Sequence, residues 1–223
     1  MRGKITLGLL LGCLAALLLT GCGGAQSRFS AHMKRGQEYF DHGDYAKASV
    51  EFRNATQIQP EAIEPRLMEA RGLERLDKPR QALGVYQFVI DKAPGNTEAI
   101  SSFGRILVTM GAAADAMKVI GPAATKHPED PKLLTVRAAA KSQLDDQAGA
   151  VADIEHALRL APTDEQAIQV RAGLYKRAGD LPGAVKFVDE AIHRSPGSTQ
   201  LRQMLVDLYV SSGEPAKAQQ QLK

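Results

Sequence analysis

The sequence predicts an all-α fold built from repeated helix pairs, and three periodic features of its 223 residues predict it. Proline recurs every 34 residues, at positions 60, 94, 128, 162 and 196. Alanine keeps the same period in another phase, at positions 48, 82, 116, 150, 184 and 218. A small residue stands twelve positions before most of these alanines: Gly36, Ala70, Gly104, Ala138 and Ala172, with Val206 as the exception.

Each interval between prolines contains two amphipathic stretches joined by a short turn. The helices of a pair can approach closely where side chains are small, as at Gly36 and Ala48. Proline lacks an N–H group and disfavours helix in the residue before it, so each periodic proline ends a second helix. The expected turns are Gly43-Asp44, Leu76-Asp77-Lys78, Met110-Gly111, Asp145-Asp146, Ala178-Gly179-Asp180 and Gly213-Glu214.

The pattern closely resembles the tetratricopeptide repeat. In the first unit the matching residues are Gly36, Gly43, Asp44, Ala48, Ala55 and Pro60, with Tyr39, Tyr45 and Phe52 at aromatic positions. The resemblance implies a right-handed superhelical α-solenoid of helix-turn-helix units over residues 29–223. The units are 29–62, 63–96, 97–130, 131–164, 165–198 and a partial unit 199–223.

Two features depart from this pattern. Charged residues replace the usual apolar residue before the small one at Arg35, Glu69, Arg137 and Arg171. We expect their stems to pack and their charged tips to reach water. The sixth unit stops at Lys223 without an obvious polar cap, so we expect either a piece of a longer array or an end that a partner covers.

Residues 1–21 have the composition of a secretory signal, with Arg2 and Lys4 before an apolar run of about 15 residues. Leu19-Thr20-Gly21-Cys22 resembles a bacterial lipobox, which implies cleavage before Cys22 and lipidation of its sulfur. The alternatives are ordinary signal cleavage nearby and an uncleaved membrane anchor. Residues 22–28 are then expected to form a lipidated flexible tether.

The expected location is the cell envelope. Gly23, not Asp, follows the cysteine, and in the enteric sorting rule this favours the outer membrane, facing the periplasm. Cys13 would leave with the signal, so Cys22 would be the one cysteine of the mature chain and would carry the lipid. Inner-membrane retention stays open.

Composition argues against nucleic acid as a partner. The 28 Lys and Arg residues exceed the 25 Asp and Glu by three, and two of them lie in the signal segment. Aromatic residues make up 5% of the chain and tryptophan is absent, which leaves little for base stacking.

The sequence predicts no catalytic activity, no cofactor, no metal site and no small-molecule substrate. None of the five histidines has another four residues away, the spacing that places two metal ligands on one helix face. Gly-x-Ser-x-Gly, Gly-x-Gly-x-x-Gly and Walker motifs are absent. Acidic pairs such as Asp145-Asp146 are adjacent in sequence and would point about 100° apart on a helix, so we interpret them as solvated surface.

What remains for function is the surface. In the resembling family the first helix of each pair lines a concave groove, and the positions carried over from it predict contacts with protein partners. They are Met33, Gln37 and Phe40; Leu67, Arg71 and Glu74; Ser101, Arg105 and Val108; Thr135, Ala139 and Ser142; Gln169, Gly173 and Lys176; and Gln203, Asp207 and Val210.

Two arginines among these positions suggest that the groove binds carboxylates, and two residues in the first unit argue against one known ligand of the family. Arg71 and Arg105 could bind a partner's carboxylates, or could pair with Glu64, Glu74 or Glu98 and do nothing else. Chaperone-binding relatives clamp a terminal carboxylate with Lys and Asn in the first groove. Met33 and Gln37 stand there instead, which argues against that ligand.

The sequence therefore favours a lipid-anchored scaffold or adaptor for envelope assembly or export. The stretch from Lys34 to Asn54 resembles the first repeat of exosortase-associated (PEP-CTERM) repeat lipoproteins, and the length is similar to that of pilotin-like lipoproteins of pilus secretin assembly. The alternatives are the non-catalytic repeat portion of a larger enzyme and a glycan-binding export protein.

Overall fold

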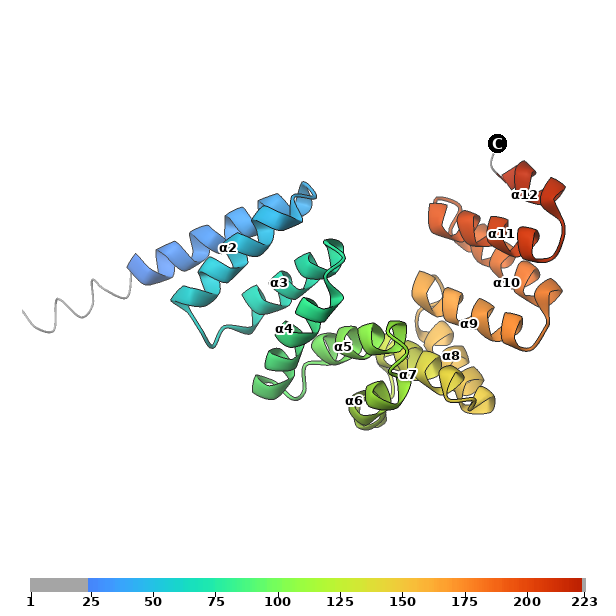
Figure 1. Ribbon diagram of the computed structural model, residues 1–223, viewed down its shortest axis with the longest axis horizontal. Coiled ribbons are helices and arrows are strands. Elements are labelled where there is room, and N and C mark those ends of the chain that lie inside the picture. The colour runs from blue at the N-terminus through green and yellow to red at the C-terminus, as the bar shows by residue number, and fades with distance from the viewer. Residues whose placement is uncertain (1–23, 222–223) are drawn as a thin grey trace, which may run out of the picture. The chain divides into compact units, whose positions relative to one another are not determined.

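The computed structural model describes residues 24–221, and within them every regular element is an α-helix (Figure 1). The signal segment 1–21 and Cys22 lie outside the described residues. A first helix covers residues 24–41. It is followed by α2 (Tyr45–Ile58), α3 (Ile63–Arg75), α4 (Pro79–Lys92), α5 (Thr97–Thr109), α6 (Ala113–Lys126), α7 (Pro131–Gln143), α8 (Gln147–Leu160), α9 (Glu165–Arg177), α10 (Leu181–Arg194), α11 (Thr199–Ser211) and α12 (Pro215–Gln221). The predicted all-α fold is confirmed.

The turn inside each pair contains one residue in the left-handed backbone conformation, and these six residues keep the 34-residue period. They are Gly43, Asp77, Gly111, Asp145, Gly179 and Gly213, with φ between 54° and 78°. The next residue often caps the second helix. Asp146 and Asp180, for example, accept the N–H of the residue three positions on, at 2.9 and 2.8 Å. The predicted turns are therefore confirmed.

The periodic prolines end the second helices as predicted. Each of these helices stops two residues before its proline, and the residue between has φ from −123° to −136° and ψ from 67° to 85°. This is the non-helical conformation that a following proline favours. The five residues are Gln59, Ala93, His127, Ala161 and Ser195.

The small residues of the first helices make room for a large side chain of the second helix. A Cβ at Gly36 would lie 2.6 Å from Cε1 of Phe52, and a Cβ at Gly104 would overlap Ile120. Phe52 and Ile120 have no exposed surface, and neither have Tyr86, Ile154 and Val188 at the equivalent positions. The predicted close approach thus serves to bury a side chain four residues after each of the first five periodic alanines.

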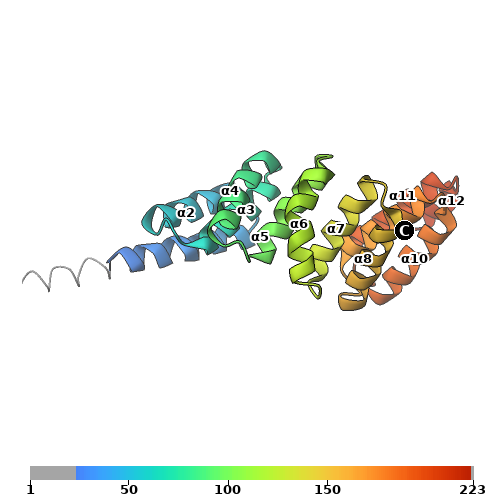
Figure 2. The same ribbon diagram turned by 90° about the horizontal axis from the view of Figure 1, so that it is seen from below.

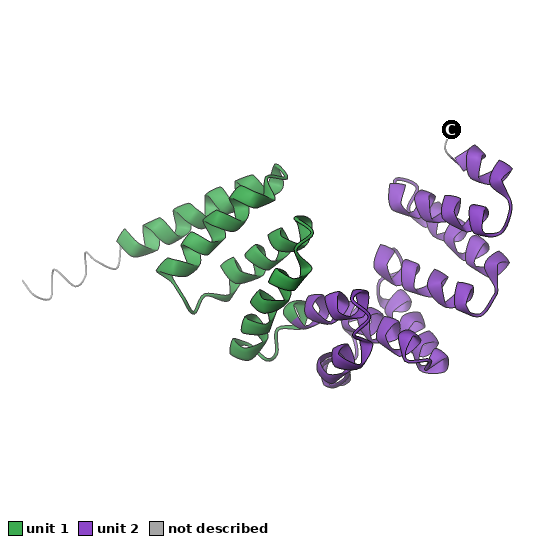
Figure 3. Ribbon diagram, in the orientation of Figure 1, with its two compact units in different colours: residues 1–99 green, residues 100–223 purple. Residues whose placement is uncertain are grey.

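The chain divides into two compact units, residues 1–99 and 100–223, and the boundary falls inside α5 (Figure 3). In the first unit, Ala48, Phe52 and Met68 form a core cluster. In the second unit α7, α9 and α11, the first helices of successive pairs, pack against one another as well as against their own partners.

Residues 24–28 correct one expectation, because they are helical and do not form a flexible tether. Ala25, Gln26 and Arg28 all have high helix propensity. The Gln59 side chain, just beyond α2, donates a hydrogen bond of 2.7 Å to Gln26 Oε1. The first helix and α2 run side by side in both views (Figure 1, Figure 2), so the packing starts before residue 29.

Candidate partner-binding groove

A hollow of about 450 Å³ lies between α9 and α11 in the second unit. Its floor is apolar, and its walls are polar. The residues that line it are Gln169, Ala172, Gly173 and Lys176 of α9 and Gln200, Gln203, Met204, Asp207 and Leu208 of α11. Five of the six positions that the sequence predicted for the fifth and sixth units are among them; Val210 is not.

The helix period explains why these residues share one face. On α9 the positions 169, 173 and 176 are separated by four and three residues, so they form a stripe along the helix. Gly173 lies in the middle of this stripe, and a Cβ there would have no neighbouring atom within 4 Å. The backbone of α9 is therefore open to a ligand at this point.

The groove offers both signs of charge on facing helices. Lys176 and Asp207 are exposed, and Gln203 donates a 3.1 Å hydrogen bond to the Asp207 carboxylate. In the part of the chain that the structure describes, Lys176 has no ion-pair partner. Glutamine amides can bind peptide groups, and Met204 adapts to varied apolar side chains. These features suit an extended or helical polypeptide segment.

In the first unit, the predicted groove residues are largely engaged within the chain. Met33 and Phe40 are partly buried against the core cluster, and the Phe40 ring lies edge-on to Tyr45 with 5.1 Å between centroids. Gln37 is exposed and donates a 2.7 Å hydrogen bond to Asp41. Leu67 is half-buried on α3.

The two predicted arginines lie in different units. Arg71 Nε donates a 2.6 Å hydrogen bond to Glu98 Oε1, and Glu74 accepts one of 2.7 Å from the Tyr86 hydroxyl. Pairing with a glutamate, one of the two interpretations open from sequence, therefore describes Arg71. Arg105 is half-buried on α5.

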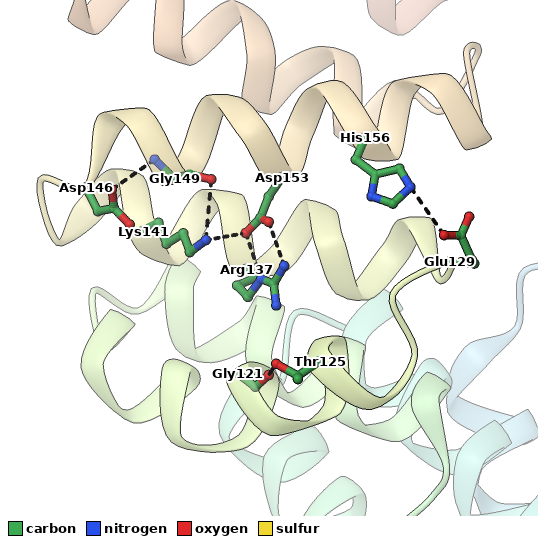
Figure 4. Close-up of polar contacts among 9 residues, drawn as sticks. All are labelled: Gly121, Thr125, Glu129, Arg137, Lys141, Asp146, Gly149, Asp153 and His156. Carbon is green, nitrogen blue, oxygen red and sulfur yellow. Dashed lines mark hydrogen bonds and ion pairs between the residues drawn. The ribbon is translucent and has the colours of Figure 1, made fainter.

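The charged residues that depart from the repeat pattern correct a second expectation, because several of their tips are paired and shielded from water. Glu69 and Arg137 side chains are 9% and 18% exposed. Arg137 Nε and Nη2 donate to the two carboxylate oxygens of Asp153 at 2.7 and 2.6 Å (Figure 4). Lys141 Nζ lies 2.9 Å from Asp153 Oδ2. A partner sixteen residues away in a neighbouring helix provides the pairing.

This network changes the acidity of Asp153. Burial raises the pKa of the carboxyl, but hydrogen bonds from Arg137 and Lys141 and the attraction of their positive charges together outweigh burial, and the pKa is lowered. The carboxylate is therefore ionised in the folded protein at neutral pH, and the cluster holds α7 against α8.

Two kinds of feature are absent from residues 24–221. These residues contain no group of three or more His, Cys, Asp or Glu side chains arranged to hold a metal ion. None of the helices described is both long enough and apolar enough to span a bilayer.

Comparison with known proteins identifies the repeat. Tetratricopeptide repeat family models match residues 29–61 and 175–223. No curated protein matches the chain. The chain therefore contains tetratricopeptide repeats at residues 29–61 and 175–223.

Solved structures of tetratricopeptide repeat proteins have a similar fold. One, from Thermus thermophilus, is 21% identical, with a TM-score of 0.71 over 82% of this chain and 99% of its own. PilW, described as a type IV pilus biogenesis factor, is 16% identical, with a TM-score of 0.71 over 86% and 90%. PilF of Pseudomonas aeruginosa is 18% identical, with a TM-score of 0.65 over 89% and 90%. At these identities the likeness concerns the fold.

Proposed function

We propose that this protein is a non-catalytic, lipid-anchored scaffold that holds a segment of a partner protein in the groove between α9 and α11. The observation that carries the proposal is the open stripe of Gln169, Gly173 and Lys176 facing Gln203 and Asp207. The stripe joins an apolar floor to polar groups of both signs, a combination suited to peptide recognition.

The proposed setting is the bacterial envelope, with Cys22 lipidated and the repeats facing the periplasm. The leader pattern before Cys22 supports the anchor. The fold similarity to PilW, a pilus biogenesis factor by its description, makes assembly of an envelope machine the favoured role. An exosortase-linked export system is the other machine that the first repeat suggests.

The groove is tested by filling it. Gly173→Tyr places a ring in the open stripe, and Gly84→Tyr is the matched control, because both glycines are helical and have open space around a new Cβ. Affinity capture from envelope extracts with the wild-type protein gives the reference set of partners. We expect Gly173→Tyr to lose partners that Gly84→Tyr retains. Identical recovery with both variants would contradict the groove.

A charge reversal gives a second test. Lys176→Glu with Asp207→Lys reverses both charges of the groove, whereas Asp115→Lys with Lys118→Glu reverses an exposed ion pair on α6. We expect at least a tenfold loss of captured partner for the first pair only.

The anchor has its own test. Cys22→Ser should abolish acyl labelling and release the protein from the membrane pellet, and Cys13→Ser should change neither. Membrane association of Cys22→Ser equal to that of the wild type would contradict lipid anchoring.

A further inference from the structure

A second hollow, of about 500 Å³, lies between α8, α9 and α10 in the same unit. Three arginines line it, namely Arg159 on α8, Arg171 on α9 and Arg194 on α10. Tyr175 and Phe187 supply aromatic walls, and Glu155 is the one acidic residue in the lining. We call this hollow the arginine notch.

The arginine notch and the candidate groove use opposite sides of α9. The exposed groove positions on α9 are 169, 173 and 176, beside the buried Ala172, whereas the notch takes positions 171 and 175. An α-helix turns about 100° per residue, so the two sets face about 150° apart. A ligand in the notch would therefore not compete directly with one in the groove.

One arginine of the notch, Arg171, already has partners within the protein. Arg171 Nη2 donates a 3.2 Å hydrogen bond to Glu155, and its guanidinium lies 4.2 Å from the centre of the Tyr175 ring. Its side chain is 16% exposed, so this contact forms part of the wall of the notch. Stacking on an aromatic ring holds a guanidinium in a fixed plane.

The other two arginines of the notch are available to a ligand. Arg159 and Arg194 are exposed at the last turns of α8 and α10, and within residues 24–221 neither has a hydrogen-bond or ion-pair partner. Together with the Arg171–Glu155 pair they give the notch a net charge of about +2, and guanidinium groups bind carboxylates through paired hydrogen bonds. Leu158, Tyr175 and Phe187 provide apolar surface between them.

We infer that the arginine notch binds an acidic segment of a partner protein, with carboxylates on Arg159 and Arg194 and an apolar side chain against Tyr175 and Phe187. A peptide fits better than a polyanion for two reasons. The chain has 28 basic and 25 acidic residues, so its net charge is too small to attract a polyanion by itself. Glu155 within the notch would repel a dense row of phosphates.

The test is a positional-scanning library of labelled hexapeptides, in which each position carries an acidic, a basic or an apolar residue, bound to the purified full-length protein. The variant is Arg159→Glu with Arg194→Glu. Lys126→Glu with Lys132→Glu is the matched control. Both lysines are exposed on neighbouring helices of the same unit, and the two substitutions change the net charge by as much as the arginine variant does.

We expect the wild type and the lysine control to select peptides that combine acidic and apolar residues. The arginine variant should bind the selected peptides at least tenfold more weakly. Gly173→Tyr should leave this selection unchanged, so failure of the notch and failure of the groove are distinguishable.

Three results would overturn the inference. The first is a wild type that selects no acidic residue, and the second is an arginine variant that binds the selected peptides as tightly as the lysine control. The third is binding to phosphatidylglycerol vesicles that the arginine variant loses while its peptide selection stays intact, which would put a membrane surface in the place of the peptide.

Discussion

The guanidinium of Arg137 donates two hydrogen bonds to the carboxylate of Asp153, of 2.7 Å from Nε and 2.6 Å from Nη2 (Figure 4). In the first repeat the two helices of the pair pack in the same way, and Arg35 Nη2 donates a 2.9 Å hydrogen bond to Glu51. Arg35 and Arg137 are three repeat lengths apart, and so are their partners. The position before the small residue can therefore carry a charge if the facing helix supplies its opposite.

The Asp153 cluster should stabilise the fold measurably. Asp153→Ala leaves Arg137 and Lys141 without their shared partner at positions only 18% and 21% exposed. We expect the free energy of unfolding to fall by about 2–3 kcal/mol, between the values typical of surface and fully buried pairs. Urea unfolding followed by circular dichroism measures it.

Asp115→Ala is the control for this prediction, because it removes an exposed carboxylate paired with Lys118. Its effect should stay within about 0.5 kcal/mol. Equal effects of the two substitutions would mean that the Asp153 cluster contributes no more than a surface pair.

The contribution of Asp153 should depend on pH. Its pKa in the folded protein is lowered from the usual 3.8, so its ionised form stabilises the fold at any pH above that value. This stabilisation is lost as the pH falls below 3.8 and through the folded pKa. The stability difference between the wild type and Asp153→Asn should therefore be full at neutral pH and shrink as the pH falls below 3.8. Urea unfolding at several pH values measures it, and a constant difference would contradict the prediction.

The helix boundaries could be predicted from the sequence because their causes are local. A proline fixes its own φ and restricts the residue before it, as at Ala161 before Pro162. Which residues line the hollow between α9 and α11 could be predicted from the resemblance to the tetratricopeptide repeat, which places Gln169 and Gln203 at equivalent positions of successive first helices. That a partner binds there stays a prediction.

The arginine notch and the pairing of Arg137 with Asp153 could not be predicted in this way. Arg159 and Arg194 are 35 residues apart, one position off the period, so no repeat pattern connects them. The partner of Arg137 became clear only when the packing of α7 on α8 set Asp153 opposite it. Such contacts depend on how side chains from separate helices meet, and the helical pattern of each segment leaves this open.

Gly104 should not tolerate a side chain. A Cβ there would overlap Ile120, which is fully buried and also confined by its own helix. We expect Gly104→Ala to destabilise the fold by about 1–3 kcal/mol, as overpacking does. Gly84→Ala, on an open helix surface, should be neutral or stabilising by up to about 1 kcal/mol.

A double variant separates overlap from other causes. Ile120→Ala removes the atoms that the new Cβ would meet, so Gly104→Ala should cost less in its presence than in the wild type. Strictly additive costs in thermal or urea unfolding would indicate that the two residues do not compete for the same space.

The two aspartates in left-handed turns should be replaceable by glycine with a gain in stability. Asp145 has φ of 64°, whereas Gly179 occupies the same turn position of the next repeat at 76°. This conformation costs a residue with a side chain about 1–2 kcal/mol, while glycine loses about 0.5–1 kcal/mol through the entropy of the unfolded chain. The exposed ion pair of Asp145 with Arg177, at 4.0 Å, adds little.

We therefore expect Asp145→Gly to raise the free energy of unfolding by about 0.5 kcal/mol. Gly179→Asp, the reciprocal change in the same unit, should lower it by a similar amount. Asp145→Gly removes a charged side chain from the turn and Gly179→Asp adds one, so the direction of the two changes in urea unfolding identifies the cause. The reverse result, a loss of stability for Asp145→Gly and a gain for Gly179→Asp, would mean that the side chain at this turn, and not its φ, determines stability.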